Sequence, residues 1–151
     1  GDSPVVPTAT MHDVPSAMAA MRNGGTPPAG ADGDLPPRRE VPTIAFHGDR
    51  DATVNVRNTN RVVPTGNAAQ GQDLNAANDA RWESATTART DARYGFTTTR
   101  VRDAFGKTIG ERWIVHGAGH AWFGGSPAGS YTDPRGPDAS SEMLRFFRDL
   151  E

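Results

Sequence analysis

Two short segments of the sequence carry the residue types of acid–base chemistry. The first is residues 47–54 (HGDRDATV) and the second is residues 116–122 (HGAGHAW), and each follows an apolar run. This order is typical of a buried strand that delivers polar side chains to the loop at its C-terminal end. Asp51 offers a carboxylate and His120 an imidazole. A carboxylate that fixes the tautomer of an imidazole, which in turn takes a proton from a nucleophile, is the acid–base half of a catalytic triad.

Each segment holds further polar residues that compete for these roles. Asp51 is preferred because it stands at the turn leaving the strand, with the apolar Val54 just behind it. We therefore expect Asp49 to be a structural turn residue, and His47 and His116 to make structural hydrogen bonds. An ordinary turn aspartate and an ordinary loop histidine are the alternatives to the catalytic interpretation.

The residues after His120 suit the wall of a pocket. Small residues flank the histidine, and the aromatic residues Trp122 and Phe123 follow it. We expect these two rings to line a substrate pocket.

No serine lies in the G-x-S-x-G pattern of a strained strand-to-helix elbow, so the sequence shows no nucleophile for a triad. Ser126 and Ser130 follow His120 closely, and we interpret them as loop residues. The absence of cysteine excludes a cysteine nucleophile, a cysteine-ligated metal and a disulfide framework.

Two metal sites are considered and rejected. His116 and His120 have a spacing that chelates zinc on a helix, but the glycines between them disfavour a helix. The pattern Asp49-x-Asp51-x-Thr53 resembles the start of a calcium loop, yet it lacks the glycine and glutamate that such a loop needs further on. We therefore expect neither a zinc nor a calcium site at these residues.

Length and composition bound the class of protein. At 151 residues the chain is long enough for one domain with its own core. A net charge of -2 gives no electrostatic reason to expect nucleic acid or an anionic membrane as a partner. No apolar run is long enough to span a membrane, and the compartment is left open.

Local patterns predict the elements that must position the two loops. A short helix is expected over 13–21, with a stop at Gly24-Gly25, followed by a Pro/Gly-rich loop to residue 40. The continuous apolar run 41–46 predicts a strand covered on both faces of a mostly parallel sheet. A helix over 54–63 ends at Pro64, and residues 65–92 are predicted to be helix or loop.

The second half of the chain gives clearer signals. Residues 96–101 and 109–116 flank a turn at 105–107 and predict a β-hairpin whose second strand leads to His120. Pro137-Asp138 is expected to cap a C-terminal helix that docks on the sheet. Its inward face is predicted to hold Met143, Phe146, Phe147 and Leu150, with Arg145 and Arg148 outward.

These segments together resemble a known family. Residues 47–54, 116–125 and 126–147 look like the C-terminal part of the poly(3-hydroxybutyrate) depolymerase family of esterases, and residues 13–21 (DVPSAMAAM) resemble a segment that follows the family's nucleophile elbow. The resemblance implies an α/β-hydrolase fold, a Ser-Asp-His mechanism on carboxylic esters, and no cofactor. Asp51 and His120 match the family's acid and base. The family resemblance is also compatible with a secreted protein.

The sequence has no counterpart of the family's N-terminal half, which carries the serine elbow and the oxyanion-hole donors. In addition, Phe123 stands where the family leads us to expect a smaller residue or proline. We therefore expect a single partial α/β-hydrolase domain over 1–151, divided into a helix region (1–23), a Pro/Gly-rich loop (24–40) and the Asp- and His-bearing strands, hairpin and C-terminal helix (41–151). Its function would be ester hydrolysis on a small molecule or polyester, with the chain inactive until paired with the missing half. The alternative is a non-catalytic, truncated hydrolase-like module that acts in binding or self-association.

Overall fold

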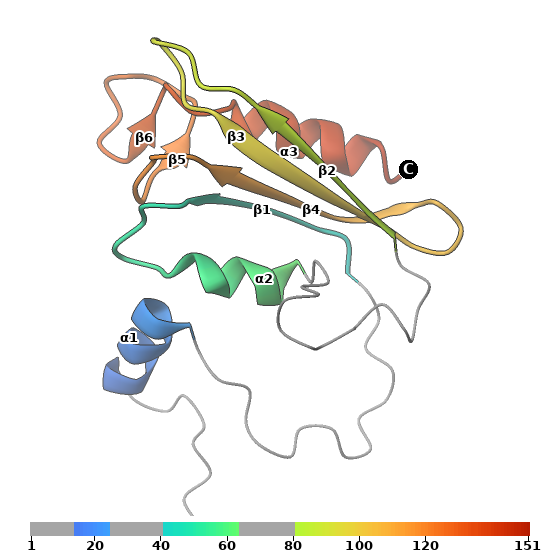
Figure 1. The fold of residues 1–151 in the computed structure, drawn as a ribbon, viewed down its shortest axis with the longest axis horizontal. Coiled ribbons are helices and arrows are strands. Elements are labelled where there is room, and N and C mark those ends of the chain that lie inside the picture. The colour runs from blue at the N-terminus through green and yellow to red at the C-terminus, as the bar shows by residue number, and fades with distance from the viewer. Residues whose placement is uncertain (1–13, 25–40, 64–80) are drawn as a thin grey trace, which may run out of the picture.

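The computed structural model describes residues 14–24, 41–63 and 81–151. Its centre is a four-stranded sheet (Figure 1). In order across the sheet, the strands are β1 (Thr43–Gly48), β4 (Thr108–Val115), β3 (Phe96–Arg102) and β2 (Arg81–Thr87). β1 and β4 are parallel, whereas β4 with β3 and β3 with β2 are antiparallel.

The remaining elements surround this sheet. Figure 1 shows α3 (Ala139–Arg148) along one face, and the 3-10 turn η1 (Val56–Asn58) with the short α2 (Thr59–Val62) beside β1. Beyond the C-terminal ends of β1 and β4, β5 (Trp122–Phe123) pairs in parallel with β6 (Thr132–Asp133). The helix α1 (Val14–Asn23) lies below α2 in the same view.

This topology corrects the predicted fold class. A mostly parallel α/β-hydrolase sheet was expected, but the sheet is mixed and has one parallel pair, so that prediction is wrong. The reason is local: β2, β3 and β4 follow one another with short connections, which favour antiparallel pairing, whereas a parallel neighbour needs a crossover. β1 is also an edge strand among the described strands, not an interior one.

The sequence analysis missed the strand β2, as well as the two-residue strands β5 and β6. Residues 65–92 were predicted to be helix or loop, and the structure makes 81–87 a strand whose side chains are all exposed. Because neither face of β2 is buried, its sequence shows no alternation of apolar and polar residues that would predict a strand. Hydrogen bonding to β3 sets the extended conformation of residues 81–87 instead. The rest of that prediction over 65–80, and the Pro/Gly-rich loop over 25–40, lie outside the described residues.

Three other local predictions are confirmed, and a fourth is corrected. The hairpin forms as β3 and β4 around a turn in which the Asp103 carboxylate accepts the backbone N–H groups of Phe105 and Lys107. α1 ends before Gly24, whose φ of 73° is in the left-handed region that glycine adopts without strain. α3 begins after Asp138, whose side chain accepts the N–H of Ser141 as an N-cap. The predicted helix over 54–63 is reduced to η1 and α2.

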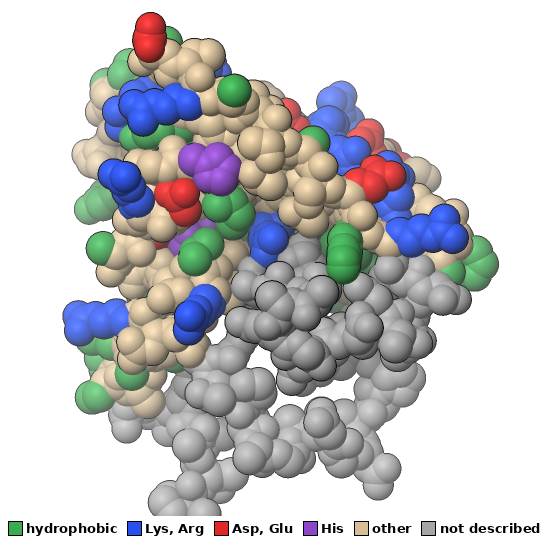
Figure 2. Space-filling view, viewed as in Figure 1, with side chains coloured by type: hydrophobic (Ala, Val, Ile, Leu, Met, Phe, Trp, Pro, Cys, Tyr) green, Lys and Arg blue, Asp and Glu red, His purple; other side chains and the backbone are tan. Residues whose placement is uncertain are grey.

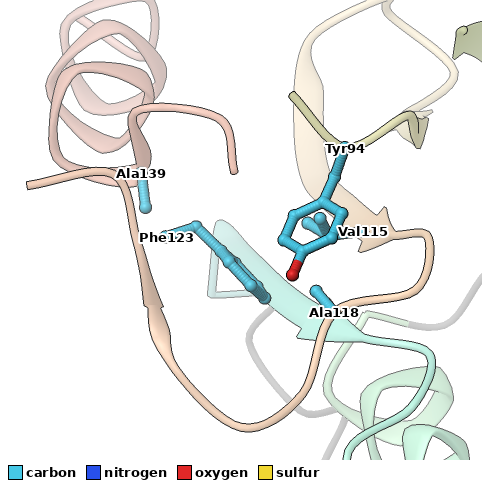
Figure 3. Packing of buried hydrophobic residues seen from close by; sticks show 5 residues of the cluster. All are labelled: Tyr94, Val115, Ala118, Phe123 and Ala139. Carbon is cyan, nitrogen blue, oxygen red and sulfur yellow. The ribbon is translucent and has the colours of Figure 1, made fainter. Parts of the chain in front are cut away.

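A small core closes the end of the sheet that carries the two candidate loops. Figure 3 shows its members, which come from the strand ends, the loops and the first turn of α3: Tyr94, Val115, Ala118, Phe123 and Ala139. Val115 and Ala118 bracket the start of the second candidate segment, so burial of these side chains fixes the backbone on which His116 and His120 are carried.

An ion pair joins α3 to the middle of the sheet. Glu111 of β4 is only 1% exposed, and Arg145 of α3 places one guanidinium nitrogen 2.8 and 2.6 Å from its two carboxylate oxygens. Arg100 of β3 reaches the same carboxylate at 3.3 Å. Burial by itself lowers the pKa of Arg145, but hydrogen bonds and charges from Glu111 and Glu142 outweigh it, so the pKa lies above its ordinary value.

This pairing corrects the predicted orientation of α3. Arg145 was expected to face outward and Phe147 inward. Instead Arg145 turns toward Glu111, Phe146 is buried, and Phe147 is half exposed. Apolar spacing alone could not reveal this, because the acidic partner lies on a strand far along the chain.

We expect Arg145→Ala to lower the free energy of unfolding by about 3 kcal/mol, because it leaves the buried Glu111 carboxylate with only the weaker Arg100 contact. Urea unfolding monitored by circular dichroism measures the change. Arg148→Ala, at an exposed position of the same helix, is the matched control and should change stability by less than about 0.5 kcal/mol. Equal stabilities for the two variants would contradict the structural role of the pair.

Candidate functional site

The parallel pairing of β1 and β4 brings both candidate segments to one edge of the sheet. Gly48, the last residue of β1, stands opposite Val115, the last residue of β4. The backbone contact continues beyond the strands: Asp49 N–H donates to Val115 O at 3.1 Å, and Arg50 N–H donates to Ala118 O at 3.0 Å. Figure 2 shows histidine side chains with an acidic one beside them on the surface at this end of the sheet.

Close approach of the two loops requires glycine at position 48. A Cβ atom there would collide with the backbone carbonyl oxygens of Ala118 and Gly119. The loop that carries His120 therefore rests directly on the backbone of β1. This contact sets the distance between the Asp51 and His120 side chains.

Asp51 and His120 form the predicted hydrogen bond. His120 Nδ1 lies 2.7 Å from Asp51 Oδ2. Since a carboxylate only accepts, Nδ1 carries the proton, and the neutral imidazole has its lone pair on Nε2. The Asp51 side chain is 4% exposed and the His120 side chain 57% exposed. Among the described residues, no side chain or backbone group hydrogen-bonds to Nε2 of His120, so this nitrogen faces a position that another group can occupy.

The backbone of the first loop holds the Asp51 carboxylate in place. Its Oδ1 accepts the N–H groups of Thr53 and Val54, both at 2.8 Å, while Oδ2 is left for His120. Burial raises the pKa of Asp51, but hydrogen bonds from Val54 N–H, His120 and Thr53 N–H outweigh it, and the pKa lies below its ordinary value. Asp51 is thus held as an anion, which is the form that stabilises a protonated imidazole.

His47 is buried beside the same carboxylate. Its Nε2 lies 2.8 Å from the Val54 carbonyl oxygen and 3.5 Å from Asp51 Oδ2. Because both neighbours are acceptors, Nε2 carries the proton and donates to Val54 O. This is the structural hydrogen bond expected for His47, and it closes the loop around Asp51.

Asp49 and His116 form a second pair, in agreement with their predicted structural roles. Asp49 Oδ2 lies 3.2 Å from His116 Nδ1, and Oδ1 accepts the Gly117 N–H at 2.7 Å. The other ring nitrogen of His116 lies 2.9 Å from Thr97 Oγ1. Sequence reasoning missed Thr97, since nothing in a run of threonines indicates which hydroxyl faces a histidine on the neighbouring strand.

The two aromatic residues after His120 have different positions. Phe123 is 2% exposed and packs in the core with Tyr94 and Ala139, so its ring serves the fold (Figure 3). Trp122 is about half exposed, and its indole N–H donates to Ser140 Oγ at 3.3 Å. A contact between Trp122 and a substrate stays a prediction.

Within the described ranges, no group of three or more histidine and acidic side chains is arranged to hold a metal ion. None of the described helices is long and apolar enough to cross a membrane. No protein-family model matches the chain, and no curated protein matches it either.

We expect Gly48→Ala to push the 117–120 loop away from β1 and to break the hydrogen bond between Asp51 and His120. Forced overpacking of this kind costs about 2 kcal/mol, which urea unfolding measures, and the NMR signal of the His120 Nδ1 proton reports the contact itself. Gly119→Ala is the control, because a Cβ at that position meets nothing within 4 Å. A wild-type Nδ1 signal in Gly48→Ala would show that the loop does not depend on this approach.

The depressed pKa of Asp51 predicts a pH-dependent contribution to stability. A carboxyl group with a folded-state pKa below its ordinary value of 3.8 stabilises the fold above that pH and loses the contribution as pH falls through the folded pKa. We therefore expect Asp51→Asn to be less stable than wild type near neutral pH, and the difference to shrink below pH 3.8. Unfolding measured across pH tests this, and a difference that does not vary with pH would contradict it.

Proposed function

We propose that this chain supplies the acid and the base of a serine-type hydrolase that acts on carboxylic esters. The observation that carries the proposal is the pair of Asp51 and His120, with 2.7 Å between the carboxylate and Nδ1 and with Nε2 open. Other contacts in the two loops hold this pair in position. Two backbone N–H groups orient the carboxylate, and buried side chains on both loops anchor their backbones.

Each residue has one role in the proposed reaction. Nε2 of His120 takes the proton from a serine hydroxyl as the serine oxygen bonds to the ester carbonyl carbon, and returns that proton to the leaving alkoxide when the ester bond breaks. A water molecule then repeats the sequence and releases the carboxylic acid. Asp51 keeps the proton of the neutral imidazole on Nδ1 and stabilises the imidazolium in between.

The nucleophile is proposed to come from a segment outside this sequence, because no serine here lies in an elbow pattern and Nε2 of His120 has no hydroxyl partner among the described residues. The substrate class rests on the resemblance of residues 47–54 and 116–147 to polyhydroxybutyrate depolymerases. The mixed sheet does not weigh against the chemistry, since the same three side chains act together on unrelated folds.

A second candidate is a module that acts in binding or self-association without catalysis. The observation in its favour is β2, an edge strand whose side chains are all exposed. An edge strand presents unpaired backbone groups with which another chain can pair. The activity measurements below separate this candidate from the proposed hydrolase.

We expect the 151-residue chain by itself to hydrolyse p-nitrophenyl butyrate no faster than buffer, because it has no activated hydroxyl and no donors for the developing oxyanion. The same chain joined to a segment with the serine elbow and oxyanion donors should hydrolyse it. In that complete protein, His120→Ala should abolish nearly all turnover, and Asp51→Asn should lower kcat by a factor on the order of 10⁴.

The control for these variants is Asp103→Asn, which alters a carboxylate in the hairpin turn at the other end of β3 and β4 and should leave kcat unchanged. Wild-type turnover in the His120 or Asp51 variants would make the pair structural and favour the non-catalytic module. Full activity of the isolated chain would instead place the nucleophile within it.

A further inference from the structure

The two candidate loops are joined by two carboxylate–imidazole pairs. The first loop holds aspartates at positions 49 and 51, and the second holds histidines at positions 116 and 120. The first aspartate, Asp49, contacts the first histidine, His116, and the second aspartate, Asp51, contacts the second histidine, His120. The proposed function uses only the Asp51–His120 pair.

The Asp49–His116 pair is part of a chain of hydrogen bonds that runs from the ends of β1 and β4 to β3 and β2. Because Asp49 Oδ2 accepts, His116 Nδ1 carries a proton, and in the neutral ring Nε2 accepts. Thr97 Oγ1–H of β3 therefore donates to Nε2, and Thr86 Oγ1–H of β2 is left to donate to Thr97 Oγ1, at 3.1 Å. The other oxygen of Asp49 accepts the Gly117 N–H. Asp49 thus ties the exit of β1 to the exit of β4, and His116 extends this tie to the hairpin.

We propose that Asp49 and His116 are positioning residues, which hold the 117–120 loop where His120 meets Asp51. The inference rests on the proposed function for its catalytic consequence, because a base that is misplaced by even 1 Å loses much of its rate. The contact between His120 and Asp51 is a structural quantity and can be tested without substrate.

The loop itself shows why it needs this support. Gly117 and Gly119 have no side chains to anchor the loop, and a Cβ at either position would meet nothing within 4 Å. Ala118 is the one buried residue between the two histidines, and its carbonyl oxygen accepts from Arg50. Burial of Ala118 and the hydrogen bond from Gly117 to Asp49 therefore hold the loop. The His120 side chain is more than half exposed, so burial restrains it little.

The two pairs differ in the state of the second ring nitrogen. Nε2 of His116 is occupied by Thr97, whereas no described group occupies Nε2 of His120. An imidazole with both nitrogens engaged by the fold is suited to hold structure. An imidazole with one open nitrogen is suited to move a proton.

Asp49→Ala in the full chain tests the proposal through the carboxyl ¹³C titration of Asp51. We expect the Asp51 midpoint to move upward, because the hydrogen bond from His120 that helps to lower its pKa is lost, and we expect the His120 Nδ1 proton signal to disappear. The direction is informative. Removal of the Asp49 charge alone would move the midpoint of a neighbouring carboxyl downward.

Three further variants complete the test. Asp49→Asn keeps an acceptor for Gly117 N–H and a polar partner for His116, and should not raise the Asp51 midpoint. Thr97→Val removes only the hydroxyl that holds His116 and, if Asp49→Ala does not fold, should give a smaller upward shift. Asp103→Ala removes a carboxylate that also accepts two backbone N–H groups, but in the distant hairpin turn, and should leave both signals unchanged.

An Asp51 midpoint and an Nδ1 signal that stay as in wild type in both Asp49→Ala and Thr97→Val would overturn the positioning role. The positioning role would also be overturned if Asp103→Ala changed the Asp51 midpoint and the Nδ1 signal as much as Asp49→Ala does, because general destabilisation would then explain the change. These outcomes leave the proposed function intact, since it fails only on the turnover of the complete protein.

Discussion

The close contact between the end of β1 and the loop after β4 is the constraint on which the site depends. Gly48 lies against the carbonyl groups of Ala118 and Gly119 with no room for a side chain, and two backbone hydrogen bonds continue the strand pairing into the loops. Since β1 and β4 are parallel, their C-terminal ends coincide, and side chains that are 69 residues apart in the chain become neighbours. An antiparallel arrangement of the same two strands would place the aspartate and the histidine at opposite ends of the sheet.

The second loop alternates between residues that build the fold and residues that face the site. Val115 and Ala118 point into the core with Tyr94 and Phe123, and the histidines at 116 and 120 point toward the aspartates. Burial on one side of the loop thus supports polar contacts on the other. The open Nε2 of the exposed His120 contrasts with His116, whose two ring nitrogens both have partners, and with the buried His47, whose Nε2 is held by the Val54 carbonyl oxygen.

The face of the sheet that α3 covers depends on a different interaction. Glu111 is buried beneath α3 and holds Arg145, while Trp113 on the same strand packs against the rings of Phe46 and Phe96. A buried carboxylate is costly unless it is paired, so this contact specifies where α3 lies on the sheet. The first turn of α3 also contributes Ala139 to the core beside the site. The helix therefore links the ion pair in the middle of the sheet to the end that carries the candidate residues.

The sequence by itself determined the elements whose signals are local: the hairpin, the capped C-terminal helix, the short N-terminal helix, and the pairing of Asp51 with His120 through two strand-then-loop segments. Turn chemistry and capping act over a few residues and can be read from them. Tertiary structure decided the mixed sheet, the exposed strand β2, the inward turn of Arg145 and the partner of His116. Each of these depends on residues distant in the chain, such as Glu111 for Arg145 and Thr97 for His116, and no local pattern encodes which distant side chain will complete a hydrogen bond or an ion pair.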